Sequence, residues 1–316
     1  MNDLSYSFNL FSKLVQRHLK VLLTNAIRLF YTLLVPIVLL VVYFLFLREL
    51  EVSTVESELL KRGIMTTNPE FISNIKTIID SWMLSGVIAL SSITISLQIC
   101  SLIVEDRTNK VSRDFVASPI KKNILVLSYF VYLFIVTFVL SFIVLIVDFI
   151  CLLILGEFHL SFLDVLLLIL LLLFTTILAC LTALLVSSLV KSEPVLASIS
   201  AIFSTAAGFL IGAYMPLSML PVGIQYFCLF VPWTYSCSLL RFAFLAKPLA
   251  NLESFLKSHK SILPSNIKYT EIVNELGNNF SYKLNFFGIY LEPIYEALIN
   301  VLFIFIFTAL CLIFSN

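Results

Sequence analysis

The amino-acid sequence is poor in charge: only 12% of its 316 residues are Asp, Glu, Lys or Arg, whereas 60% are hydrophobic. Soluble globular chains are about one quarter charged and about half apolar, so this composition excludes an ordinary soluble domain. The formal net charge of +1 gives no electrostatic reason to expect a nucleic-acid partner. The composition is typical of a polytopic membrane protein.

Glycine and histidine are also scarce. None of the eight glycines precedes a lysine, so the chain has no G-x-x-x-x-G-K-[ST] loop for binding ATP phosphates. The three histidines, His18, His159 and His259, lie outside the long apolar runs, and no H-E-x-x-H motif occurs. The sequence therefore predicts no catalytic residue, no metal site and no cofactor site in this chain.

The six cysteines form no C-x-x-C pair and mostly lie within apolar runs. Thiols in such surroundings usually behave as small hydrophobic groups. Cys228 and Cys237 could lie near the outer face, and the spacing alone leaves open whether they pair.

Six apolar stretches reach the roughly 20 residues that a membrane-spanning helix needs. Four of them contain no charged residue, the third contains only Asp148, and the last is uncharged from residue 297 onward. The predicted spans are 29–47, 82–104, 124–155, 165–190, 194–215 and 294–314. Residues 1–28 alternate apolar side chains such as Phe11 and Leu14 with basic ones such as Lys13 and Arg17, which predicts an amphipathic helix in the inner membrane interface.

Positive charge in short loops predicts the orientation. Residues 1–28 contain four Lys or Arg residues and residues 105–123 contain five, whereas the connector 156–164 contains none. Both basic segments are therefore expected in the cytoplasm, together with both chain termini. Residues 48–81 and a small cap formed by residues 246–293 are expected outside.

Residues 216–245 are apolar but interrupted by Pro216, Pro221 and Pro232. Proline in a helix interior removes a hydrogen bond and clashes with the preceding turn, and irregular backbone at membrane depth needs protein or water around it. We expect a re-entrant hairpin that enters from outside; a seventh, kinked span is the alternative. The predicted fold class is an all-α polytopic membrane protein, a single domain over 1–316. It has six transmembrane helices, an N-terminal amphipathic interfacial helix and a re-entrant hairpin before the last span.

The segment 105–123 combines charges of both signs with a few apolar residues. Val111 and Phe115 could anchor a short helix in the groove of a soluble partner, with charged residues around them. Ser118 and Pro119 would end that helix, and Lys121 would lie at the lipid headgroups. The candidate docking residues are Glu105, Arg107, Lys110, Val111, Arg113, Asp114, Phe115, Ser118 and Pro119. The alternative is an ordinary positive-inside connector.

Two further features bear on function. Asp148 is the only carboxylate inside an apolar run, and ionisable residues at membrane depth are usually functional. Because its run exceeds the length needed to cross, we expect Asp148 at or beyond the outer interface rather than in a proton or substrate path. Gly208 and Gly212 give the fifth span a small face that could contact a second copy across a dimer axis. The alternative is coincidence in a helix rich in small residues.

Two short patterns resemble a known family. Glu105-x-Arg107 followed by Asp114-Phe115-x-x-Ser118-Pro119-Ile120-Lys121 is similar to the coupling-helix region of ABC-2 type (type 2 exporter) permeases. The stretch from Gly208 through Met215-Pro216, Leu220-Pro221, Pro232, Tyr235 and Leu240-Arg241 resembles that family's signature around the fifth span. The resemblance extends over essentially the full chain. One departure is Lys110, where many members carry a glycine.

The resemblance implies the permease subunit of an ABC exporter in the cell membrane, with no ATPase site of its own. Each permease would form half of a dimer, with an identical or related copy, and would dock a separate ATPase subunit that binds ATP and magnesium. A hydrophobic or amphipathic substrate, such as a drug, peptide or lipid-like molecule, would leave along a path lined by the second and fifth spans. Membrane lipid is a further expected partner. The alternatives are a self-sufficient secondary transporter or channel, for which Asp148 is the only intramembrane carboxylate, and a membrane scaffold or immunity protein without transport activity.

Overall fold

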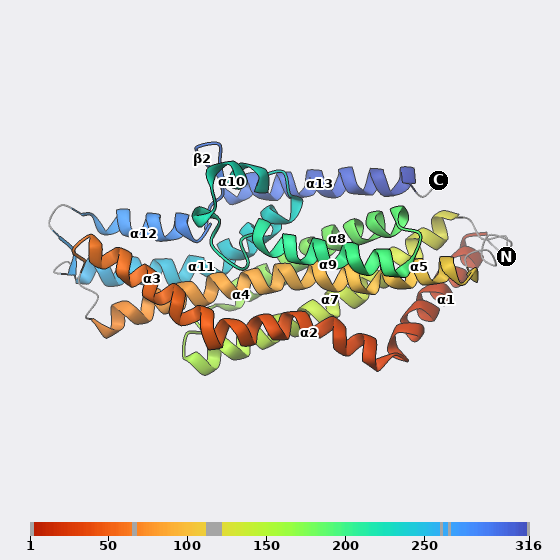
Figure 1. Cartoon of the computed structure of the whole chain (residues 1–316), viewed down its shortest axis with the longest axis horizontal. Coiled ribbons are helices and arrows are strands. Elements are labelled where there is room, and N and C mark those ends of the chain that lie inside the picture. Colours follow the sequence, from red (N-terminus) through yellow and green to blue (C-terminus); the bar gives the residue numbers. More distant parts are fainter. Residues whose placement is uncertain (1–2, 65–67, 112–121, 260–261, 265–266, 315–316) are drawn as a thin grey trace.

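The structure is a computed structural model that describes residues 3–64, 68–111, 122–259, 262–264 and 267–314. Long helices run side by side along the longest axis of the molecule (Figure 1). Within these described residues, six helices are long and apolar enough to cross a membrane. Between its first and last turns a helix satisfies its backbone hydrogen bonds internally, which lipid requires. The predicted all-α fold class with six candidate spans is confirmed.

Residues 3–189 form the N-terminal helix and four of the candidate spans. The helices of this part are α1 (Asp3–Leu23), α2 (Ala26–Val42) with a π-helical continuation (Tyr43–Leu47), α3 (Arg48–Lys61), α4 (Pro69–Ile99), α5 (Ser101–Thr108), α7 (Lys122–Leu155) and α8 (Phe162–Leu189). After α8 the helices are interrupted more often. This part of the chain consists of α9 (Glu193–Leu210), a 3-10 turn (Leu217–Met219), α10 (Val222–Cys228), α11 (Pro232–Ser258), α12 (Tyr269–Asn279), the two-residue antiparallel strands β1 (Asn285–Phe286) and β2 (Ile289–Tyr290), and α13 (Pro293–Phe314).

Local sequence signals set several helix starts. The Asn25 side chain accepts the Arg28 N–H at 3.0 Å, and the Asn68 side chain accepts the Glu70 N–H at 2.9 Å just before Pro69. Ser161 and Asp164 form a capping box at the start of α8. These side chains satisfy backbone N–H groups that a helix leaves without partners at its N-terminus.

Helix α4 forms the centre of the bundle. It packs against α2, α7, α8, α9 and α11, and its side chains from Thr77 to Leu97 are buried. Several hydroxyl groups on this helix have partners inside the protein: Ser91 donates to the Val87 carbonyl at 2.6 Å, and Ser96 donates to the Ala179 carbonyl of α8 at 3.2 Å. Small hydroxyl residues allow the surrounding helices to approach closely.

The elongated bundle has two distinct ends (Figure 1). Helices α1 and α5 and the last turns of α13 lie at one end, which we call the terminal end. Helices α3 and α12 and the last turns of α11 lie at the opposite end, which we call the distal end. This arrangement agrees with an even number of crossings between α1 and the end of α13.

The proline-rich segment after α9 is bent. Helices α10 and α11 meet at an angle of 92°, a geometry shared by a broken span and a re-entrant loop, so the re-entrant hairpin stays a prediction. Helix α11 continues through residue 245 to Ser258 and thus joins the expected hairpin to the expected cap, in which α12 and the two short strands follow. Cys228 and Cys237 are both buried free thiols.

Candidate functional site

A groove of about 730 Å³ lies between α2, the junction of α4 with α5, and α9. Its volume falls within the range of roughly 300–1,000 Å³ that is usual for ligand pockets. The groove side chains are Arg28, Tyr31, Thr32, Val35, Leu97, Gln98, Ser101, Glu193, Pro194, Leu196, Ala197, Ser200, Ala201, Ser204, Thr205 and Tyr214. On α9 the helical spacing of Glu193, Ala197, Ser200 and Ser204 places these residues on one face.

The groove is mainly apolar, with charge confined to Arg28 and Glu193. Its hydroxyl groups bond largely to backbone: Thr32 donates to the Arg28 carbonyl at 2.8 Å, and Ser200 donates to the Leu97 carbonyl at 3.3 Å. Such a surface can accommodate an apolar molecule and offers polar contacts where the two charged side chains lie.

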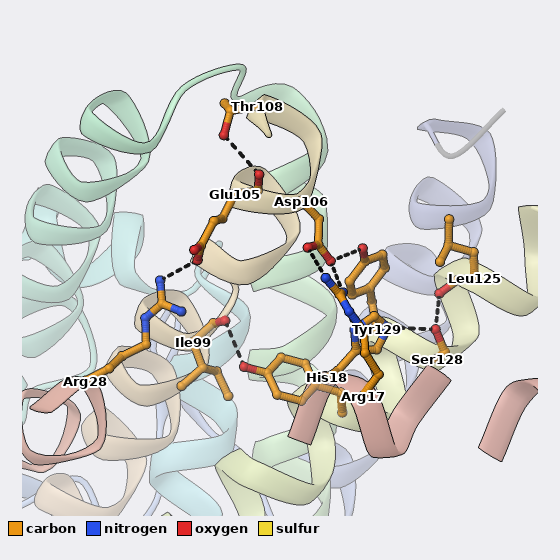
Figure 2. Close-up of polar contacts among 11 residues, drawn as sticks. Arg17, His18, Arg28, Ile99, Glu105, Asp106, Thr108, Leu125, Ser128 and Tyr129 are labelled. Carbon is orange, nitrogen blue, oxygen red and sulfur yellow. Dashed lines mark hydrogen bonds and ion pairs between the residues drawn. The ribbon is translucent and has the colours of Figure 1, made fainter. Parts of the chain in front are cut away.

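A buried carboxylate, Asp106 of α5, organises the terminal end of the molecule (Figure 2). Both of its oxygens accept from the Arg17 guanidinium of α1, with Nη2 at 2.6 Å from Oδ1, and the Tyr129 hydroxyl of α7 donates to Oδ2 at 2.7 Å. Bidentate pairing fixes both the distance and the plane of the guanidinium. Asp106 therefore fastens α1 and α7 to α5.

His18 completes this contact. Its ring stacks on the Tyr129 ring with centroids 4.3 Å apart, and its Nε2 lies 3.2 Å from the Ser128 hydroxyl. Burial lowers the pKa of the His18 imidazole to about 4, and the adjacent Arg17 guanidinium acts in the same direction. We call Arg17, His18, Asp106 and Tyr129 the terminal cluster. The predicted amphipathic helix is thus packed against α7 along one face.

Helix α5 also contacts the helices that line the groove. Glu105 accepts from Arg28 of α2 at 3.0 Å (Figure 2), and the Thr108 hydroxyl lies 3.4 Å from the Glu193 carboxylate of α9. The Arg107 guanidinium donates to two carbonyls at the end of α8, those of Ser187 at 3.1 Å and Val190 at 2.9 Å. A cation at a helix C-terminus satisfies free carbonyls and the helix dipole. Helix α5 therefore joins α2, α8 and α9.

The structure reaches only part of the predicted docking segment. Glu105 and Arg107 lie in α5, and Lys110 and Val111 follow it. Arg113, Asp114, Phe115, Ser118 and Pro119 lie outside the described residues, so the docking helix stays a prediction. Lys110 has a φ of 64°, a left-handed conformation that glycine adopts without strain. The departure noted in the sequence thus falls where the backbone favours glycine.

The prediction that Gly208 and Gly212 share one helix face is wrong, because α9 ends at Leu210 and Gly212 has a left-handed φ of 69°. Both glycines have partners within the chain. A Cβ at Gly208 would lie 2.2 Å from the Tyr214 ring, and the Gly212 carbonyl accepts from the buried Arg241 guanidinium. Their role in a dimer contact stays a prediction.

Asp148 lies on α7, seven residues before the helix ends, and is fully buried in protein. Neither of its carboxylate oxygens has a hydrogen-bond partner among the described residues. A place at the outer interface and a role in a proton or substrate path both stay predictions. The described residues contain no group of three or more His, Cys, Asp or Glu that could hold a metal ion.

Sequence reasoning missed a second polar cluster, toward the distal end. Arg48 pairs with both oxygens of Asp80, at 2.9 Å from Nε to Oδ1 and 2.7 Å from Nη2 to Oδ2, and also reaches Glu157 at 3.2 Å. The Tyr43 hydroxyl donates to Asp80 at 2.5 Å. We call these four residues the distal cluster. Burial and the nearby Asp80 carboxylate raise the pKa of Glu157 to about 8.

A signal for the distal cluster exists in the sequence, although it is weak. Arg48, Asp80 and Glu157 each lie within two residues of a predicted apolar span, at ends that the orientation rule assigns to the same face. Charges at such positions usually contact water, so the sequence alone gives no reason to expect contacts among them. The three segments converge in the fold, which gives these charges protein partners instead.

The comparison with known proteins agrees with this architecture. A protein-family model described as "ABC-2 family transporter protein" matches residues 49–315, which is most of the chain. A search of curated proteins found no match. With six candidate spans, a long groove and the family match over most of its length, the chain belongs to the ABC-2 transporter family and is a permease of an ABC transporter.

Proposed function

We propose that this permease is the transmembrane subunit of an exporter that moves a hydrophobic or amphipathic substrate out of the cell. The observation that carries the proposal is the position of α5. Glu105 pairs with Arg28 of α2, and Thr108 contacts Glu193 of α9, and both partners line the groove. A force applied to the segment that follows α5 would thus reach both sides of the groove.

A separate ATPase subunit would supply that force. The chain has no phosphate loop, so ATP and magnesium would bind to the partner. The segment 105–123 would dock in a groove of the ATPase, and closure of two ATPase subunits around ATP would displace α5. The contacts of α5 with α1, α7, α8 and α9 would then carry the displacement into the spans.

A second permease copy would enclose the groove. Both groove helices expose large apolar side chains, including Phe30 and Ile37 on α2 and Ile202 and Phe209 on α9. A two-fold contact between such surfaces, in a dimer of identical or related permeases, would bury them and leave the groove facing its counterpart. With both termini in the cytoplasm, the substrate would leave from the cytoplasm or the inner leaflet of the cell membrane.

The decisive experiment is a pull-down of the ATPase by permease variants in detergent. Phe115→Ala removes the predicted aromatic anchor, a change that commonly costs about 2 kcal/mol or more at an interface hot spot. At about 1.4 kcal/mol per tenfold change, affinity should fall by roughly an order of magnitude or more. Lys121→Ala is the matched control, since it should weaken only a headgroup contact worth about 1 kcal/mol.

Transport and partner-dependent ATP turnover should be lost with Phe115→Ala, while membrane insertion remains. The isolated permease should hydrolyse no ATP. If Phe115→Ala retains the ATPase at the parent level, the segment 105–123 is an ordinary connector and not a docking site. Robust ATP hydrolysis by the isolated chain would contradict the proposal that ATP binds only to the partner subunit.

A further inference from the structure

A second pocket, of about 320 Å³, lies between α8, α11 and α13 and shares no side chain with the groove. Its walls include Leu167, Leu170 and Phe174 of α8, Phe242 of α11, and Ala297 and Asn300 of α13. Asn300 is the only polar residue of the pocket, and its amide donates to the Ser236 hydroxyl of α11 at 2.5 Å. The pocket therefore offers an almost purely apolar surface.

The pocket opens on the outside of the bundle. Leu170 is 48% exposed and Ile294 of α13 is 63% exposed, and both line the opening. In a multi-pass membrane protein such a surface faces hydrocarbon or another protein. An apolar pocket that opens there can be filled from the bilayer without passage through water.

An ion pair lies close to this pocket along two of its helices: Asp164 precedes the pocket residue Leu167 by three positions on α8, and Lys247 follows Phe242 by five positions on α11. Lys247 of α11 pairs with Asp164 of α8 at 2.8 Å, and both side chains are partly exposed. The Ser161 backbone N–H, at 2.7 Å, and the Ser161 hydroxyl, at 2.8 Å, also donate to Asp164, so the carboxylate is held in place. The pair thus supplies one cation and one anion, which can exchange their mutual contact for the phosphate and ammonium of a zwitterionic headgroup.

The spacing along α8 matches the depth of one lipid leaflet. The pocket residues Leu167 to Phe174 follow Asp164 by three to ten positions, or about 4.5–15 Å at 1.5 Å per residue. Half of the roughly 30 Å hydrocarbon core of a bilayer is about 15 Å. A headgroup at the ion pair would place its acyl chain beside these side chains.

We propose that this pocket binds one acyl chain of a membrane phospholipid whose zwitterionic headgroup contacts Lys247 and Asp164. The bound lipid fills the space between α13 and the pair α8 and α11 and thereby fastens the last helix to the bundle. This site is independent of the proposed export activity and of any ATPase partner.

Photolabelling tests the site. The full-length permease is placed in lipid nanodiscs that contain a trace of phosphatidylethanolamine with a diazirine group on one acyl chain, and labelled peptides are mapped after irradiation. Label should concentrate on residues 167–174 and 293–301, and excess unlabelled phosphatidylethanolamine should displace it there but not at the exposed Phe305 of α13. Uniform, non-displaceable labelling of lipid-facing helices would overturn the proposal.

Two variants and one control variant test the site further. Ala297→Leu fills the pocket and should lower its labelling about tenfold, whereas Ala309→Leu, the same change at an exposed position of α13, should leave it unchanged. Lys247→Gln should lower labelling about fivefold, equivalent to about 1 kcal/mol at 1.4 kcal/mol per tenfold. Parent-level labelling of Ala297→Leu would show bulk lipid only, and parent-level labelling of Lys247→Gln would overturn the headgroup assignment. The displacement measurement on the parent chain decides the question if a variant fails to fold.

Discussion

The two polar clusters of this permease repeat one arrangement at two levels of the helix pair α4–α5, around Asp80 within α4 and around Asp106 near the end of α5. In each, a buried aspartate, Asp80 or Asp106, accepts from an arginine through both oxygens and from a tyrosine hydroxyl. The two aspartates are 26 positions apart, or about 39 Å along a helix. Since the hydrocarbon core is about 30 Å thick, and about 40–45 Å with the headgroup regions, both clusters can lie near the membrane interfaces.

The clusters differ in their fourth member and hence in how their charge depends on pH. The distal cluster contains a second carboxylate, Glu157, so that one arginine faces two acids. The terminal cluster contains His18, whose lowered pKa keeps it neutral near pH 7. Near pH 7 both clusters are therefore close to electrical balance, because the raised pKa of Glu157 keeps most of that carboxyl group protonated. The distal cluster gains negative charge as pH rises through 8. The same scaffold thus gives its two ends different sensitivities to pH and to mutation.

Removal of the arginine should cost more at the distal cluster. Arg48→Met leaves the fully buried Asp80 beside Glu157 with only the Tyr43 hydroxyl as a donor, and breaking a buried pair costs about 3–5 kcal/mol. Arg48 is also the more buried arginine, with its side chain 16% exposed against 32% for Arg17. Arg17→Met leaves one carboxylate that still accepts from Tyr129, which costs about 1–3 kcal/mol. Thermal unfolding of the purified permease in detergent measures both. Glu157→Gln should partly rescue Arg48→Met, and equal losses for the two arginine variants would remove the distinction between the clusters.

Alkaline pH should weaken the distal cluster. The pKa of Glu157 is raised to about 8 in the fold from an ordinary 4.5, so its contribution is fully present below pH 4.5 and is lost as pH rises through 8. Unfolding temperatures should therefore fall across this window in the parent and fall less in Glu157→Gln. An unchanged slope in the variant would show that another group titrates there.

Acid should weaken the terminal cluster, over a narrower window. The pKa of His18 is lowered to about 4 from 6.5, so its contribution is present above pH 6.5 and is lost as pH falls through 4. His18→Gln should flatten this limb of the stability profile. His159→Gln, at an exposed histidine, serves as the control and should leave the limb intact. Flattening by both variants would trace the acid response to histidine in general rather than to this cluster.

The smallest effect is expected at Asp148, a buried carboxylate that belongs to neither cluster. ATP-driven export needs no ion-carrying carboxylate in the spans, so Asp148→Asn should leave transport by the permease–ATPase complex within about twofold, a change of about 0.4 kcal/mol at 1.4 kcal/mol per tenfold. Flux in proteoliposomes with and without ATP measures this. Loss of an ATP-independent, ion-driven flux in Asp148→Asn would favour a secondary transporter instead.

Hydropathy was sufficient to predict the all-α class and the six candidate spans, because lipid requires long apolar helices. It could not predict where α9 ends. Residues 194–215 are uniformly uncharged, yet the helix stops at Leu210, where Gly212 turns the chain and Tyr214 folds back onto Gly208. Hydropathy reports how well a segment suits the bilayer, whereas the end of α9 depends on the tertiary contact between Tyr214 and Gly208.

The polar clusters show a second limit of sequence reasoning. Arg48 and Glu157 are 109 residues apart, and Arg17 and Asp106 are 89 residues apart. No short motif connects such positions, and each charge alone resembles a solvated residue at the end of a span. Glu105 and Arg107 were identified through a family pattern, but their partners Arg28, Ser187 and Val190 became evident only in three dimensions.

Helices α4 and α5 form a nearly continuous helix. Their only interruption is at Cys100, whose N–H still donates to the Ser96 carbonyl at 3.1 Å and whose carbonyl accepts the Ile103 N–H at 3.0 Å. About 39 Å of helix separates Asp80 from Asp106, so a tilt of this helix by about 5° at one aspartate moves the other by about 3 Å. A small angular movement on one side of the membrane would thus be large enough, on the other side, to separate Arg48 from Asp80.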